Sequence, residues 1–166
     1  MPTATYELIS TGNGNGSADT ITLSSIPATY TDLVLVIKAK NVSGAISGVR
    51  LRFNGDTTDG NYSGVRVSVG PSTIDDERDP AGSYVINAVN DEFNVGVVNI
   101  MGYSSTAFRK STLTLSGWAR SGSDFIRVHL GTWKDTSAIT SVTLFNDSSY
   151  AWTTDSTITL YGIKAS

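Results

Sequence analysis

The single histidine of the chain, His129, is the first residue to weigh as a catalytic group. It lies where Ile126, Val128 and Leu130 alternate with Arg127 and His129 itself. A Ser/His/Asp triad needs such a histidine, but the sequence has no G-x-S-x-G turn to present a nucleophile. Its place on the polar side of a predicted strand indicates a surface or interface histidine, so we expect no enzymatic activity.

A second group with potential chemistry is the turn that holds Asp56, Asp59 and Asn61 among glycines. Closely spaced oxygen ligands can hold Ca²⁺, although the glutamate that closes an EF-hand loop is missing. Asp and Asn in turns more often accept hydrogen bonds from their own backbone. We therefore expect no metal and no cofactor, with an ion at this turn left as an open alternative.

An acidic run, Asp75–Asp79, precedes Pro80. Like charges this close repel one another unless a cation or a basic partner neutralises them. The run is typical of a solvated loop, and a second metal site here is a weaker alternative.

Four cations are the candidate partner-binding residues: Lys38, Lys40, Arg50 and Arg52. They project from the outer faces of two successive predicted strands. If Asn41–Ser47 is the hairpin turn between these strands, the four side chains share one patch. Such a patch would protect a sheet edge or would dock on an acidic partner surface.

Aromatic side chains offer one further chemistry, the stacking of sugars. Such residues mostly fill cores and interfaces, and Trp133 is expected to be half-buried or interfacial because it shares a strand face with His129. The candidates for a stacking platform are Trp118, Trp133, Trp152, Tyr62, Tyr84, Tyr103 and Tyr150.

Composition bounds the classes of function. The 166 residues suit one domain, residues 1–166, and they include no cysteine for disulfides or thiolate metal sites. The net charge of −3 argues against nucleic-acid binding, which favours a basic excess. The longest apolar run, Leu33–Ile37, is too short to span a bilayer, and the first residues do not resemble a signal peptide. We expect synthesis in the cytoplasm and no membrane partner.

The elements that must position these residues are strands, because apolar and polar residues alternate repeatedly with a period of two. Glycine- and asparagine-rich turns separate them at short intervals, which predicts an all-β, two-sheet antiparallel sandwich of jelly-roll type with about ten strands. The apolar stripes are expected to face one dry interior and the hydroxyl-rich stripes to face solvent. Pro71–Gly82 and Tyr103–Lys110 are predicted to be long loops.

Several blocks of the sequence resemble small β-structural virion proteins of tailed phages, especially cyanophages. The middle of the chain, roughly Pro71 to Phe93, shows no such resemblance. The blocks occur in the family's order and are Ser25–Val36, Leu51–Asp56 with Asn61–Ser63, Gly131–Trp133 with Ala138–Leu144, and Thr159–Ala165.

The resemblance implies a virion component without a catalytic motif, either a capsid decoration (cement) protein or a part of a tail fibre. The short chain has no shaft-forming segment, which favours decoration. We expect it on the outer surface of the head, bound to the major capsid protein and self-associated as a homotrimer. The alternative is a tail-fibre or adaptor domain that recognises glycans of the host surface.

Overall fold

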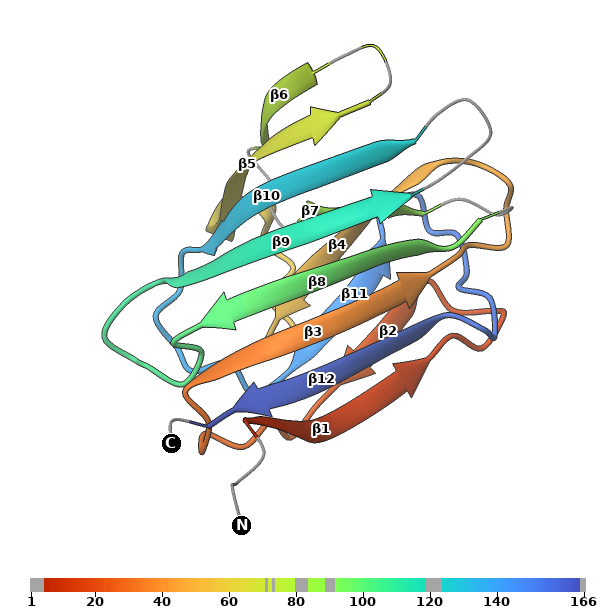
Figure 1. The fold of residues 1–166 in the computed structure, drawn as a ribbon. Helices are drawn as coiled ribbons and strands as arrows, with labels where there is room; N and C mark the ends of the chain where they lie inside the picture. The colour runs from red at the N-terminus through yellow and green to blue at the C-terminus, as the bar shows by residue number, and fades with distance from the viewer. Residues whose placement is uncertain are drawn as a thin grey trace.

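The computed structural model describes residues 5–70, 72, 74–79, 84–88, 92–118 and 124–164. Two antiparallel sheets face each other, and neither closes on itself (Figure 1). The all-β, sandwich-like prediction is confirmed. The larger sheet has eight strands in the order β1-β12-β3-β8-β9-β10-β5-β6, and the smaller has four in the order β2-β11-β4-β7.

Successive side chains of a strand point to opposite faces of the sheet, which matches the alternation of apolar and polar residues in these segments. The strands of the large sheet are β1 (Tyr6–Asn13), β12 (Thr157–Ile163), β3 (Asp32–Ala39), β8 (Asn94–Met101), β9 (Lys110–Trp118), β10 (Phe125–Trp133), β5 (Tyr62–Val69) and β6 (Ile74–Asp79). Those of the small sheet are β2 (Thr20–Leu23), β11 (Val142–Asn146), β4 (Ser47–Phe53) and β7 (Tyr84–Ala88). A 3-10 turn, Asp59–Asn61, precedes β5.

The acidic run is a strand and not the solvated loop that its charge predicted. β6 pairs with β5 along its whole length, from Gly64 opposite Asp79 to Val69 opposite Ile74. The ion pair between Arg66 and Glu77 links the two strands. The charges are compatible with pairing to β5 because the side chains of this edge strand are exposed to water. On the free edge of β6, charged residues discourage pairing with a further strand. The side chain of Asp79 lies outside the described residues.

The core lies between the small sheet and the half of the large sheet that contains β3 and β12. Leu35 and Ile37 from β3 and Leu160 from β12 face Leu51 from β4 and Leu144 from β11, and all five are 1% exposed or less. In this half of the molecule the apolar stripes point inward, as predicted. The buried cluster also takes in Trp152, Tyr103 and Ile139 from the connecting loops.

The turn after β4 follows the predicted turn chemistry. Asn54 and Gly55 have φ values of 52° and 70°, in the left-handed region that favours Asn and Gly. The Asn54 side chain then binds the segment before β11, accepting hydrogen bonds from the backbone amides of Thr140 and Ser141. This contact ties the end of β4 to the start of β11, its neighbour in the small sheet.

Candidate interaction surface

The four predicted partner-binding cations do not form one patch. Lys38 lies on β3 in the large sheet, whereas Arg50 and Arg52 lie on β4 in the small sheet, so the connection 41–46 crosses between sheets and is not a hairpin turn. Asn41 forms a bridge to Trp152 at the start of this crossing. The prediction of a shared patch is wrong because alternation fixes which residues share a strand face but not which strands pair.

The two lysines instead surround an aromatic ring. The ammonium nitrogens of Lys38 and Lys40 lie 4.1 Å and 5.5 Å from the centroid of Phe93. A cation within about 6 Å of a ring face gains a modest electrostatic stabilisation. Their contact with Phe93 is therefore local, at the end of β3.

Arg50 and Arg52 do lie together, on the outer face of the small sheet. The guanidinium carbon of Arg52 lies 3.9 Å from the ring centroid of Phe145. A guanidinium nitrogen of the same arginine lies 3.9 Å from a carboxylate oxygen of Asp59. Arg50 lies 3.5 Å from the carboxylate of Asp147. These residues line a shallow polar groove in which two cations are partly balanced by two carboxylates.

His129 occupies the interior, contrary to the surface position that was predicted. It is 1% exposed and faces the same side of β10 as Arg127, whose Nε donates a hydrogen bond of 2.8 Å to Ser68. A Cβ added to Gly64 on the neighbouring strand would lie 2.4 Å from the imidazole, so the ring packs directly on that glycine. The polar side of β10 is thus its inner side.

The same inversion extends over the strands next to β10. Thr114 and Ser116 on β9 and Ser68 on β5 are buried, while the aliphatic residues between them point away from the small sheet. The expectation of inward apolar stripes is therefore wrong for β5, β9 and β10. From the small sheet, β7 lies against β9 and β10, and β4 reaches β10 through the contact of Phe53 with Trp133. The interior there contains buried polar side chains, unlike the apolar core under β3 and β12.

The aliphatic residues of β5, β9 and β10, together with some from β3 and β8, form one exposed surface, here called the outer apolar face. They lie on the side of the large sheet that faces the viewer in Figure 1, with the small sheet behind it. Strand register makes it continuous: Val36 lies opposite Val97, Val97 opposite Leu115, and Leu115 opposite Val128. Each member is between 38% and 61% exposed. The members are Val36, Val95, Val97, Leu113, Leu115, Ile126, Val128, Leu130, Val65, Val67 and Val69.

The Asp56 turn is a structural element. One carboxylate oxygen of Asp56 accepts hydrogen bonds from Trp133 Nε1 at 2.8 Å and Asn61 Nδ2 at 2.9 Å, and the other accepts one from the Thr58 amide at 2.9 Å. Partial burial acts to raise the pKa of Asp56, but these hydrogen bonds outweigh it and hold the pKa below its usual range. The bond from the Thr58 amide is of the backbone kind that the turn chemistry predicts, whereas the bonds from Trp133 and Asn61 come from side chains.

The described members of the candidate sugar-stacking set are mostly core residues, as the alternative interpretation of these aromatics predicted. Trp133, Trp152, Tyr62 and Tyr103 are all at most 2% exposed and belong to the core. Trp118 is stacked on Phe125, with ring centroids 4.6 Å apart. Of the remaining candidates, Tyr150 is half-buried, and the side chain of Tyr84 lies outside the described residues.

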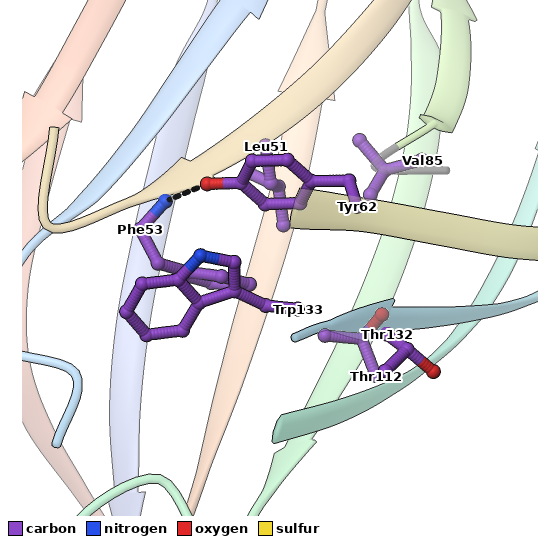
Figure 2. Close-up of a pocket in the computed structure, with 7 residues that line it drawn as sticks. All are labelled: Leu51, Phe53, Tyr62, Val85, Thr112, Thr132 and Trp133. Atoms are coloured by element: carbon purple, nitrogen blue, oxygen red, sulfur yellow. Dashed lines mark hydrogen bonds between the residues drawn. The ribbon is translucent and has the colours of Figure 1, made fainter. Parts of the chain in front are cut away.

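Figure 2 shows the small cavity beside these buried rings, where Tyr62 and Trp133 both approach Phe53. The Tyr62 hydroxyl accepts a hydrogen bond of 3.1 Å from the Phe53 amide and donates one of 3.1 Å to the Asp56 carbonyl. Desolvation raises the pKa of Tyr62 to about 12. The cavity has a volume of about 10 Å³, room for one water and not for a substrate.

Comparison of the chain with protein-family models, with curated proteins and with solved structures gave no match. Within the described ranges, no helix has the length and apolar character to cross a membrane. The same residues contain no cluster of three or more His, Asp or Glu side chains arranged to hold a metal ion.

Sequence reasoning missed the outer apolar face, although every residue in it had been placed on a strand. The available signal was the polar residues on the opposite face of the same strands. Arg66, Arg127 and His129 alternate with aliphatic residues, and these three polar residues were predicted to face solvent. Large polar side chains on an inner face leave the aliphatic stripe no interior position, because the two stripes of a strand occupy opposite faces. This surface, and not a cleft, is the candidate functional site.

Proposed function

We propose that the protein is a structural component of a phage virion, a capsid decoration protein that binds the outer surface of the head and stabilises the shell. It acts by binding alone, as a homo-oligomer, without a chemical step. The observation that carries this proposal is the outer apolar face. Soluble monomers rarely expose a contiguous apolar patch of more than a few hundred Å², and larger patches mark association surfaces.

The sequence blocks that resemble phage virion proteins are the reason for proposing a virion as the assembly. The jelly-roll class of the fold is part of the same proposal. Trp133, within one of these blocks, is used in the core, bonded to Asp56. The blocks therefore maintain the fold that displays the surface. Such an arrangement, in which buried residues maintain the fold and the surface binds, suits a protein that acts by binding and not by catalysis.

The groove around Arg50 and Arg52 is the proposed contact with an acidic surface of the major capsid protein. Both arginines are partly exposed, with side chains 21% and 29% accessible. Positive groups at an interface accelerate association with an acidic partner and select its orientation. Since Asp59 and Asp147 already balance part of this charge, the contribution to binding is expected to be moderate and sensitive to salt.

The test is binding of the purified protein to phage heads that lack it, measured by co-sedimentation and by the temperature at which the heads release DNA. The proposal predicts saturable binding and a higher release temperature. The double variant R50E/R52E should bind at least about tenfold more weakly at physiological salt. R109E/K164E changes the net charge equally at exposed sites outside the groove and serves as the matched control.

Absence of binding to heads, together with retention on a host-glycan array, would contradict the decoration role and favour the tail-fibre alternative. Burial of Trp133, Trp152, Tyr62 and Tyr103 removes four of the seven candidate stacking residues from that alternative. Equal binding by R50E/R52E and its control would remove the arginine groove from the proposal and leave the decoration role in place.

A further inference from the structure

The centre of the outer apolar face is uncharged. Four adjacent strands, β8, β9, β10 and β5, present twelve outward positions in three rows, and ten of these hold Val, Leu or Ile. The exceptions are Asn99 and Gly117. The rows are Val95-Gly117-Ile126-Val69, Val97-Leu115-Val128-Val67 and Asn99-Leu113-Leu130-Val65.

Charged residues lie at both margins of this surface. Lys38 lies opposite Val95 on β3, and on β6 Asp76 and Arg78 lie opposite Val67 and Val65. An apolar centre with a charged rim is the anatomy of a protein–protein interface. The strand order therefore outlines an interface six strands wide, from β3 to β6.

The size of the face matches a stable interface. The exposed fractions of its eleven members, between 38% and 61%, together equal about five fully exposed aliphatic residues. That corresponds to roughly 800 Å², the area that each partner contributes to an interface of standard size. Water contact over such an area is unfavourable, so a partner is required to cover it.

We infer that the occupant of the outer apolar face is a second copy of this chain, packed sheet against sheet. Interfaces of transient complexes are about as apolar as the rest of a protein surface, whereas those between permanent identical subunits are more apolar. An uncharged centre of ten aliphatic residues belongs to the second class. The inference rests on the proposed role as an assembly component and names the partner at this surface.

The geometry of a twisted sheet points the same way. Two sheets pack face to face when their twists match, with strands aligned to within about 30° and interdigitated aliphatic side chains. A partner must therefore offer a similarly twisted, uncharged sheet face. A second copy of the chain has such a face because its sheet is identical. The rim carries both signs of charge, with Lys38 at one margin and Asp76 and Arg78 at the other, so identical copies can also form ion pairs around the centre.

The test is the mass of the purified chain in solution, measured by sedimentation equilibrium between about 1 and 100 μM, the range over which micromolar association is resolved. The inference predicts a mass of at least twice 17.6 kDa at the upper end. In I126K an uncompensated charge enters the apolar centre, and the association should weaken by about a hundredfold or more. Ile46, which is 54% exposed in the connection before β4, makes I46K the matched control with unchanged association.

Because Ile126 is 61% exposed, lysine should fold there, and melting followed by circular dichroism checks this. V128T, which keeps the β-branched shape and the neutral charge, is the second variant and should weaken association by about tenfold. A monomer at 100 μM, or an association that I126K leaves unchanged, would overturn the inference.

Binding of the same variants to heads separates this inference from the proposed function. A monomeric wild-type chain whose I126K variant loses head binding would show that the face meets the capsid directly, which overturns the inference and keeps the decoration role. A chain that associates through this face but does not bind heads would support the inference and contradict the decoration role.

Discussion

Replacement of Asp56 by alanine tests how the turn before β5 is held. In the native chain the Asp56 carboxylate accepts three N–H groups, from Trp133, Asn61 and Thr58. Trp133 is 2% exposed, so in D56A its indole N–H loses its acceptor in a nearly dry site. The alanine side chain cannot replace any of these bonds.

The expected loss of stability follows from the burial of each donor. An unsatisfied buried N–H costs about 1–3 kcal/mol, and each of the two more exposed bonds contributes about 0.5–1.5 kcal/mol. D56A should therefore lower the free energy of unfolding by about 2–6 kcal/mol, which at this chain length is a fall in Tm of about 5–20 °C. Urea titration and calorimetry both measure it.

The pH dependence of this loss has a defined sign. Because the pKa of native Asp56 lies below its usual range, its contribution is complete above the unfolded-state pKa of about 3.9. It disappears as the pH falls through the lower native pKa, so wild type and D56A should converge in acid.

A double-mutant cycle with W133F isolates the indole bond, since phenylalanine has no N–H. We expect a coupling free energy of at least about 1 kcal/mol between Asp56 and Trp133. A cost below about 0.5 kcal/mol for D56A, or costs of D56A and W133F that simply add, would refute the reasoning.

Three further predictions concern the core and its edges. The phenol of Tyr62 should ionise near pH 12 in a difference titration against Y62F at 295 nm, and its contribution to stability should be complete up to about pH 10 and be lost as the pH rises through 12. K110M should cost about 2–4 kcal/mol in urea unfolding, because the fully buried Lys110 donates to two loop carbonyls at 2.9 Å, each of which would lose its donor. G162A should cost about 1–3 kcal/mol by calorimetry, because an added Cβ would meet ring atoms of Tyr30 at 2.3 to 2.5 Å. Ionisation of Tyr62 near pH 10 would contradict its burial. A wild-type Tm in K110M or G162A would contradict the contacts described for Lys110 or Gly162.

Period-two alternation was enough to predict an all-β sandwich and to locate most strands, because the side-chain period of a strand is fixed by backbone geometry. The structure has twelve strands, where about ten were predicted. The run Asp75–Asp79 was missed, since its charges resemble a loop and only its pairing with β5 makes it a strand. Pairing of this kind is a non-local property that local pattern does not encode.

The candidate site was harder to predict, because alternation tells which residues share a face and not which face is inside. For β3 the apolar stripe is buried, while for β10 the stripe with Ile126 and Val128 is exposed and His129 is buried. The inner side of both strands is buried, and what differs is the kind of side chain placed there, polar on β10 and apolar on β3. The same lack of pairing information led to the wrong grouping of Lys38 with Arg50.

The central claim is that the outer apolar face is covered in the functional state. The chain has no cysteine, so a single introduced thiol reports on one position without background. The decisive measurement is the rate of maleimide labelling of V128C compared with I46C, at concentrations where the protein is assembled. The account predicts labelling of V128C at least about tenfold slower, rising to the I46C rate on dilution. Equal rates for the two variants at every concentration, with and without heads, would contradict it.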